Sequence, residues 1–354
     1  MAIVFGVIFA AILMFAIGND PFQGYLFLFK GGLMSVERIA NTISTAVPLI
    51  LTGLSVGFAF RTGLFNIGAP GQMLVGGMAS TAVALTCANY IPRPLLLIVL
   101  ILVGFIGGAI WAGIVGFLKA KFNVNEVVGS IMLNWIANWA VFYIIPEYFK
   151  AEGVETQSRQ ISEAASLRAS WITDLFQGSF LNYGLIIAII AVIVIWFIIS
   201  KTTLGYELKA VGFNKDAAEF AGISVNRNIV ISMMISGALA GLAGVTQYLG
   251  NGNCMQTGLM PLQGFDGMAV ALLANNSPIG ILFAALFIGF LYAGKGFMTT
   301  MAGIPPEIAD TIIAIIIYFA ATSMIIDKFI YKHKMKKKMK IEVSNGSSEV
   351  KEEK

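Results

Sequence analysis

The stretch RTGLFNIGAPGQML, residues 61–74, interrupts the apolar sequence on both of its sides. It holds three glycines, one proline and the side-chain amides of Asn66 and Gln72. Glycine and proline disfavour a continuous helix, and inside a membrane a helix can break only where the freed backbone groups find protein or a water-lined cavity. The stretch therefore predicts either an ordinary turn between two helices or a broken segment beside a solute path. Its spacing alone favours neither reading.

The composition indicates that most of the chain faces lipid. Of its 354 residues, 57% are hydrophobic and only 12% are charged, whereas soluble domains carry about a quarter charged residues. Apolar runs long enough to cross a bilayer, about 17 to 25 residues each, recur along the chain. We expect an all-α polytopic membrane protein with about ten transmembrane helices, the eighth of them short. The expected spans are 2–17, 43–60, 71–88, 95–118, 126–145, 182–200, 229–249, 262–275, 278–296 and 307–326.

The distribution of Lys and Arg predicts the orientation, because cytoplasmic segments carry an excess of both. With ten spans and both termini in the cytoplasm, 16 of the 23 Lys and Arg residues fall inside. A single transmembrane domain would cover residues 1–326. Residues 146–181 would then form an extracellular loop and residues 201–228 a cytoplasmic loop. The basic tail, residues 327–354, is expected to be disordered and to lie near anionic lipid headgroups.

The sequence lacks the residues that several classes of function require. The two cysteines, Cys87 and Cys254, form no metal or redox motif, and the one histidine, His333, lies in the tail. Residues 289–296, GFLYAGKG, match only the first part of a phosphate-binding loop and lie in an apolar run. We therefore expect no metal, no cofactor, no nucleic acid and no enzymatic activity in this chain. ATP hydrolysis, if it drives transport, would belong to another polypeptide.

The segment DAAEFAG in the cytoplasmic loop predicts a very short helix. Asp216 and Glu219 fit a capping box, and Gly222 fits a C-terminal glycine stop. A helix of little more than one turn is unstable alone. It is therefore either a solvated surface helix or an element that docks into a partner's groove, where Ala217 and Ala218 would allow close approach.

Polar side chains within the spans are candidates for the solute path, because they are costly in lipid. Asn134 and Asn138 lie one helical turn apart in the fifth span. Together with Asn66 and Gln72 they form the candidate path residues, and hydrogen bonding between helices is the alternative role for each asparagine. The run SGALAGLAG, residues 236–244, has small residues at helical spacing and predicts a helix buried among others.

Four blocks, in order, resemble the permease subunits of bacterial ABC importers, in the branch shared by ribose, branched-chain amino-acid and nucleoside systems. The blocks are FRTGLFNIGAPGQM, NEVVGSIMLNWIA, LKAVGFNKDAAEFAGISV with ISGALAGLAG, and GFDGMAVALLANNSPIG, and they extend from residue 60 to residue 280. The FNIGA-x-GQ core of the first block is similar to the nucleoside, or simple-sugar-like, subgroup. One departure is Pro70, where the family usually has a glutamate, so residue 70 is given no polar role.

The resemblance implies a type II ABC importer-like permease in a bacterial plasma (inner) membrane that carries nucleosides by alternating access. Its partners would be an ABC ATPase subunit, a second homologous permease (a heterodimer) and an extracytoplasmic substrate-binding lipoprotein, which the 146–181 loop would contact. The segment 214–222 would be the coupling helix that enters the ATPase, with the residues Asp216, Ala217, Ala218, Glu219 and Gly222. The alternatives are a permease for ribose, another sugar or branched-chain amino acids, and a stand-alone secondary transporter or channel.

Overall fold

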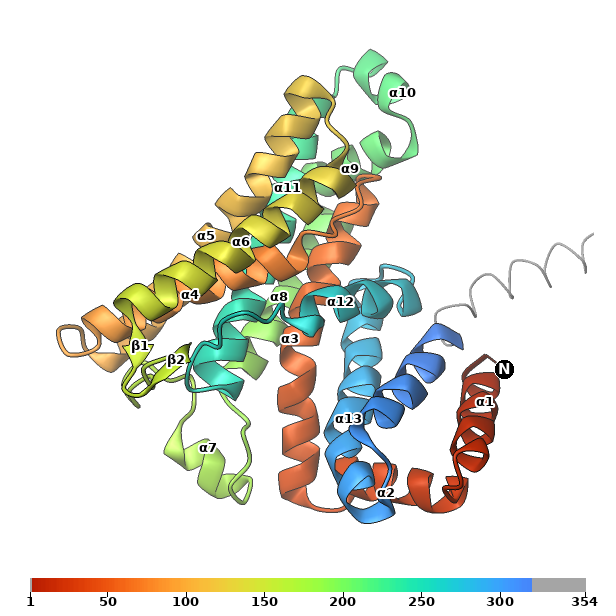
Figure 1. Cartoon of the computed structure of the whole chain (residues 1–354). Helices are drawn as coiled ribbons and strands as arrows, with labels where there is room; N and C mark the ends of the chain where they lie inside the picture. The colour runs from red at the N-terminus through yellow and green to blue at the C-terminus, as the bar shows by residue number, and fades with distance from the viewer. Residues whose placement is uncertain (1, 320–354) are drawn as a thin grey trace, which may run out of the picture.

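The structure is a computed structural model that describes residues 2–319 (Figure 1). The predicted basic tail, 327–354, lies outside the described residues, as does the end of the tenth expected span. Nearly all regular structure is helical, and the exception among the described residues is a small antiparallel hairpin of β1 (Lys150–Ala151) and β2 (Val154–Ser158).

Long helices make up the bundle, and shorter ones lie at its ends and edges. The long helices are α3 (Val36–Arg61), α4 (Ala69–Cys87), α5 (Arg93–Phe122), α6 (Glu126–Tyr148), α8 (Gly184–Lys201), α11 (Val225–Thr246) and α13 (Pro278–Ala302). The shorter ones are α1 (Ala2–Ala16), α2 (Pro21–Leu33), α7 (Ser170–Leu175), α9 (Thr203–Phe213), α10 (Lys215–Phe220) and α12 (Leu262–Leu273). A π-helical turn, η1 (Gln247–Asn251), extends α11, and residues 306–319 are again helical.

The prediction of an all-α polytopic membrane protein is confirmed, whereas the count of ten spans is not. Among the described residues, 6 helices are long and apolar enough to cross a membrane, or up to 7 if the bent pair α1–α2 is one span. α4 is rich in Gly, Ser and Thr and packs between α5, α6 and α11. α12 has only 12 residues, as expected for the short eighth span.

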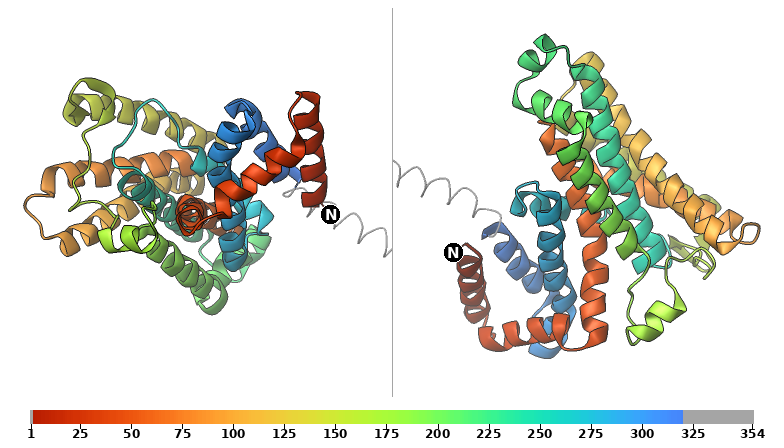
Figure 2. Two further views of the ribbon diagram at one scale, coloured as in Figure 1. Left: turned by 90° about the horizontal axis from the view of Figure 1, so that it is seen from below. Right: turned by 180° about the vertical axis from the view of Figure 1, so that it is seen from behind.

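A turn of 120° separates α1 from α2, so that α2 runs across one end of the bundle (Figures 1 and 2). The sequence reading had placed this region in an extracellular loop. Asp20 caps α2 by accepting a hydrogen bond from the backbone N–H of Phe22 at 2.9 Å, and Pro21 occupies the first turn, where its missing N–H costs nothing. Phe22 is 76% exposed. α2 is thus a helix at the end of the bundle rather than a loop.

α11 is one of the two most buried helices among those that could span a membrane. In its most apolar window 78% of residues are buried, against 83% for α3 and 28% for α5. Small residues explain the difference, because a methyl group added to Gly241 would meet the carbonyl oxygen of Gly104 in α5, and one added to Gly244 would meet that of Met73 in α4. The predicted burial of residues 236–244 is confirmed. α5 instead leaves much of its surface exposed.

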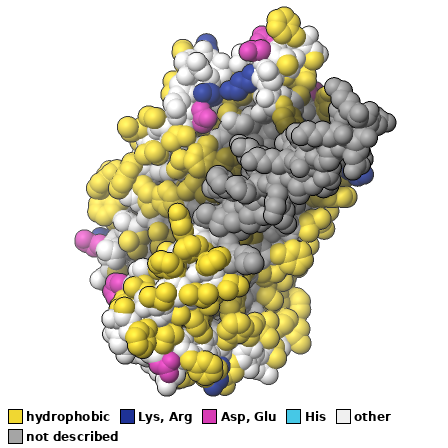
Figure 3. All heavy atoms as spheres, turned by 90° about the vertical axis from the view of Figure 1, so that its right-hand side faces the viewer, with side chains coloured by type: hydrophobic (Ala, Val, Ile, Leu, Met, Phe, Trp, Pro, Cys, Tyr) yellow, Lys and Arg dark blue, Asp and Glu magenta, His cyan; other side chains and the backbone are white. Residues whose placement is uncertain are grey.

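The helix 306–319 packs back against α1. Ala10 and Met14 of α1 share a buried apolar cluster with Ile312 and Ile316. Gly6 permits the contact, since an added Cβ would lie 3.1 Å from the Cα of Ile316. The first and last described helices are therefore neighbours. Figure 3 shows the face on this side of the molecule, where hydrophobic side chains dominate and charged ones are few, as expected for a surface in contact with lipid.

The two hydrophilic segments lie at opposite ends of the bundle. α9 and α10 form one end, and the hairpin β1–β2 with α7 lies at the other (Figures 1 and 2). This arrangement agrees with their predicted placement on opposite sides of a membrane.

Candidate functional site

The opening stretch of the sequence is a true break between two helices. α3 ends at Arg61 and α4 begins at Ala69. Gly63 has a φ of +70°, a left-handed conformation that glycine adopts without strain. Pro70 falls in the first turn of α4, where proline is well tolerated, so the helix resumes earlier than the glycines and proline of the sequence suggested.

The amides of Asn66 and Gln72 close this break by pairing with each other. Asn66 Nδ2 donates to Gln72 Oε1 at 2.9 Å, and Gln72 Nε2 donates to Asn66 Oδ1 at 3.0 Å. Asn66 also donates to Ser236 Oγ of α11 at 2.7 Å and accepts from the Gly68 N–H at 2.9 Å. Both amide side chains are at most 1% exposed. The two candidate path residues are therefore buried and hydrogen-bonded within the chain.

Asn134 holds the other side of the break. Its Oδ1 accepts from the Gly71 N–H at 2.9 Å, and its Nδ2 donates to the Ile67 carbonyl at 3.0 Å. Asn138, one turn further along α6, is 7% exposed and makes no hydrogen bond with any residue in the described range 2–319. Three of the four candidate path residues thus join helices in this conformation, and Asn138 is the one whose amide remains uncommitted.

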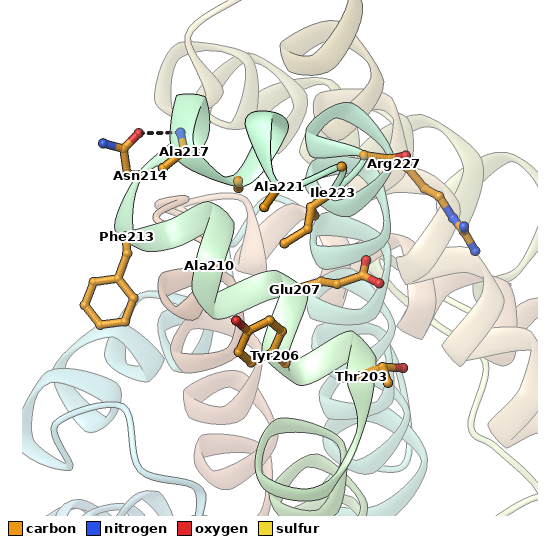
Figure 4. A pocket seen from close by; sticks show the side chains of 13 residues that line it. Thr203, Tyr206, Glu207, Ala210, Phe213, Asn214, Ala217, Ala221, Ile223 and Arg227 are labelled. Atoms are coloured by element: carbon orange, nitrogen blue, oxygen red, sulfur yellow. Dashed lines mark hydrogen bonds between the residues drawn. The ribbon is translucent and has the colours of Figure 1, made fainter.

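The predicted short helix is present as α10, but a different residue caps it. Asn214 accepts a hydrogen bond from the Ala217 N–H at 3.0 Å, as Figure 4 shows. The predicted capping box of Asp216 and Glu219 is wrong, because Asp216 already lies inside the first turn, where its charge favours the positive helix end. The glycine stop is confirmed: Gly222 has a φ of +81°.

α9 and α10 together form a projection, residues 203–224, that we call the knob. Phe213 and Phe220 expose 91% and 95% of their surface, whereas Ala218 is buried at 3%. Only Ala217 of the two predicted contact alanines therefore faces outward. A hollow of about 760 Å³ lies between α9, α10 and the start of α11 (Figure 4). Phe213 lines this hollow, and Phe220 lines a separate one of about 380 Å³ with Asp216 and Glu219. Exposed aromatic rings beside hollows suit contact with another protein, since aromatic residues are enriched at such interfaces.

The knob touches the break directly. Gly212 of α9 packs against the Arg61 carbonyl, and a methyl group there would also lie 3.1 Å from the Gly63 nitrogen. Thr62 and Ser232 share a hydrogen bond of 2.8 Å between their hydroxyls, which ties the same turn to α11. The knob therefore contacts the same segment that Asn66 holds. The sequence reading missed this contact, although two glycines in separate polar loops are a signal for a close backbone approach.

The segment predicted to be extracellular is anchored to the end of η1. Arg168 donates from Nε to the Gly250 carbonyl at 2.8 Å and from Nη2 to the Asn251 carbonyl. A cation at these carbonyls complements the negative end of a helix. Partial burial lowers the pKa of Arg168 from its usual value. Hydrogen bonds from Arg168 thus hold the 146–181 segment against the end of the bundle, and we call this segment the cover.

The remaining reactive groups are dispersed. Within residues 2–319 there is no group of three or more His, Cys, Asp and Glu side chains that could hold a metal ion. Cys87 and Cys254 are both free thiols. Residues 289–296, the partial phosphate-loop match, lie inside the continuous helix α13, where Lys295 pairs with Asp310 at 2.5 Å.

Comparison with known proteins gives matches over most of the chain. The family described as branched-chain amino acid transport system / permease component matches residues 38–321. The nucleoside ABC transporter permease protein NupB of Lactococcus lactis subsp. cremoris is 44% identical over 94% of this chain and 93% of its own length. The guanosine ABC transporter permease protein NupP of Bacillus subtilis is 42% identical over 96% of each chain. The glucose ABC transporter permease protein TsgB13 of Haloferax volcanii is 33% identical over 87% of this chain and 82% of its own length.

Weaker similarity extends to a second permease protein in each of the two bacteria named. These second proteins are 29% identical in Bacillus subtilis and 27% identical in Lactococcus lactis, each over 71% of this chain and 79% of the relative.

Proposed function

This chain belongs to the branched-chain amino acid transport system / permease component family, and from that premise we propose that it forms the translocation path of an ATP-driven importer for nucleosides. The observation that carries the choice of solute is identity of 44% and 42%, over nearly the whole chain, to permeases named for nucleosides and guanosine. The chain itself is a transport subunit and not an enzyme.

The knob is the proposed coupling element for a separate ABC ATPase. Its outward surface has what a docking helix needs: the exposed ring of Phe220, the charges of Asp216 and Glu219, and the small side chain of Ala217. Gly222 ends α10 so that the chain can continue into α11. Ala218 is buried and packs α10 against the rest of the knob. Closure of the ATPase pair on ATP would displace the knob.

Alternating access would then follow from the contact of Gly212 with the end of α3. A displaced α9 presses on residues 62–68, and the amides of Asn66, Gln72 and Asn134 would exchange partners as the break rearranges. In this proposal these three residues and Asn138 lie along the solute path. The hydrogen bonds found in the structure are those of one of the two states.

The proposed assembly follows the same logic. A second, homologous permease would complete a heterodimer, as the paired permeases of the two bacteria suggest. The 146–181 segment, together with the hairpin and α7, would receive a substrate-binding lipoprotein on the outer face of a bacterial plasma membrane. Both termini would then be cytoplasmic, and residues 1–326 would form one permease domain.

Uptake of radiolabelled adenosine, guanosine and uridine by cells with and without this chain tests the solute. Loss of uptake on deletion, with recovery from a plasmid copy, is the expected result. Unchanged uptake of all three nucleosides on deletion would refute nucleoside import. Persistence of uptake after removal of the ATPase would instead indicate a stand-alone transporter or channel.

A sugar is the second candidate, because a glucose permease is 33% identical over 87% of the chain. The same cells, supplied with labelled glucose and ribose, distinguish the two. Loss of sugar uptake with retained nucleoside uptake would favour the sugar.

Docking of the knob is tested by Phe220→Ala combined with Glu219→Arg. Both side chains are exposed, so the fold should be unaffected, whereas loss of a central aromatic contact costs about 2 kcal/mol or more in binding. We expect the ATPase to co-purify at least tenfold less well. The matched control is Tyr90→Ala, an 85% exposed aromatic after α4.

A further inference from the structure

A hollow of about 210 Å³ lies at the end of the bundle opposite the knob, where α3, η1, α12 and the segment before α8 meet. Amides, hydroxyls and one aromatic ring line it. Asn41 and Thr45 come from α3, Gln247 from η1, Gln263 from α12, and Phe180 from the covering segment. No residue with a formal charge is among those that line it.

Three amide groups in this hollow have unused hydrogen-bonding capacity. Within residues 2–319 the side chains of Gln247 and Gln263 make no hydrogen bond, although both are only partly exposed. Asn41 uses its Oδ1 to accept from the Phe180 N–H at 2.8 Å and leaves its Nδ2 without a partner in the same range. The neighbouring Asn251, by contrast, is fully used: its Oδ1 accepts from Ser44 at 2.6 Å, and its Nδ2 donates to the Ser44 carbonyl at 3.0 Å.

The surrounding contacts hold the hollow in shape. Phe180 is fixed by its backbone, because its carbonyl accepts from Asn182 Nδ2 at 2.9 Å and its N–H donates to Asn41 Oδ1 at 2.8 Å. The guanidinium of Arg168 lies 4.9 Å from the centre of the Phe180 ring on one face. The same arginine binds the terminal carbonyls of η1, so a single residue holds both the ring and the helix turn that carries Gln247.

The π-helical turn itself supports a functional reading. Such turns have poorer hydrogen bonds than an α-helix and occur often at functional sites. Here the turn ends α11 and presents Gln247 at the hollow. Gln247, the first residue of the turn, and Asn251, its last, both line the hollow.

We propose that this hollow is a transient binding station for the base of a nucleoside as it enters the permease. A planar, neutral base with donors and acceptors on its edge matches two free glutamine amides, the free Asn41 Nδ2 and an aromatic face. A zwitterionic amino acid would need charged partners, which are not among the residues lining the hollow. At about 210 Å³ the hollow is smaller than usual ligand pockets, which measure about 300–1,000 Å³. Contact with the base alone, and hence weak binding, suits a solute that must move on.

This inference rests on the proposed nucleoside import, and the test separates the two. The variant is Gln247→Met with Gln263→Met, which keeps side-chain length and removes both amides. In cells that carry the complete importer, we expect uptake of labelled adenosine, guanosine and uridine to fall about tenfold, since each lost hydrogen bond accounts for roughly a threefold to tenfold change. Because the bases differ in their edges, the ratio of purine to pyrimidine uptake should shift at least about threefold.

The controls exclude a purely structural effect. Gln256→Met removes an exposed amide on the same end of the bundle, outside the hollow, and should leave uptake unchanged. Phe180→Ala should lower uptake, and Phe180→Tyr should restore it, because the aromatic face is what the base uses. If the double variant fails to reach the membrane, the single Gln263→Met variant is measured, with an expected loss of about threefold.

Each outcome decides one of the two proposals. Normal rates and normal base ratios in the variants, with nucleoside uptake by the unsubstituted chain, would overturn the binding station and leave nucleoside import intact. Absence of nucleoside uptake by the unsubstituted chain would overturn both. A uniform loss for all bases without a change in their ratio would also overturn the station, since it would indicate damage to the fold or to coupling.

Discussion

The break at residues 62–68 and the outer hollow are both polar regions of a largely apolar bundle, yet their polar groups are in opposite states. In the break, Asn66 and Gln72 are almost wholly buried and satisfy each other. In the hollow, Gln247 and Gln263 are partly exposed and make no hydrogen bond within the described residues. In this conformation the state of the hydrogen bonds therefore distinguishes the two regions: the amides of the break join parts of the chain, and those of the hollow are free to bind a solute.

The largest expected effect tests whether the break is a fastening. Asn66→Leu would leave the Gly68 N–H and the Gln72 amide without their partner, at about 1–3 kcal/mol for each buried group, whereas Ser236 keeps its hydrogen bond to the Ser55 carbonyl. We expect a loss of about 2–4 kcal/mol in stability, seen as a lower unfolding temperature of the purified protein in detergent. Asn138→Leu is the matched control, with little change. Equal stability of the two variants would remove the distinction drawn for the break.

A second variant sharpens the link between the break and the knob. Gly212→Ala would place a methyl group against the Arg61 carbonyl, and overpacking of this kind costs about 1–3 kcal/mol. We expect ATP hydrolysis to continue while uptake falls about tenfold, measured together in vesicles that contain the whole importer. Gly296→Ala, on α13 with open space around it, should change neither. Parallel loss of both activities would show that the contact serves assembly rather than coupling.

A smaller effect is expected for Asn41, whose side-chain oxygen forms a hydrogen bond but whose side-chain nitrogen does not within the described residues. Asn41→Leu removes the acceptor of the Phe180 N–H, and one hydrogen bond of this kind accounts for about 1 kcal/mol. The unfolding temperature should fall slightly, and Phe180 should become more mobile. Hydrogen exchange at residues 176–183 measures this, with exchange in α11 as the internal reference. Unchanged exchange there would mean that Arg168 and Asn182 hold Phe180 without Asn41.

The smallest effect is expected at the unused amides. Gln263→Met removes no hydrogen bond within the described residues, so stability should stay within about 0.5 kcal/mol. The same unfolding measurement as for Asn66→Leu checks it. A loss as large as that of Asn66→Leu would erase the contrast between the two regions.

The sequence predicted those features that depend on local chemistry. The glycines and proline of residues 61–74 indicated a break, Gly222 indicated a helix end, and the small residues of 236–244 indicated burial. The helix cap was misassigned because Asp216 and Asn214 are both good capping residues two positions apart. Only the backbone conformation of the folded chain selects between them.

The outer hollow could not have been predicted, for a different reason. Its residues come from positions as far apart as 41 and 263, and a single sequence carries no record of which distant residues meet. The π-helical turn has no compositional signature either. α2 had a local signal, Asp20 followed by Pro21, but the apolar residues after it are too few for a span, and no helix was expected between the spans 2–17 and 43–60.

The packing of α1 against the helix 306–319 has a consequence for biogenesis. Ala10 and Met14 are synthesised long before Ile312 and Ile316, which pack against them. Until the helix 306–319 has been made, α1 lacks this partner, so this corner of the protein is completed only after α13. A nascent chain stopped before residue 306 would leave its beginning open to lipid, and to the quality-control proteases that recognise unpacked membrane segments.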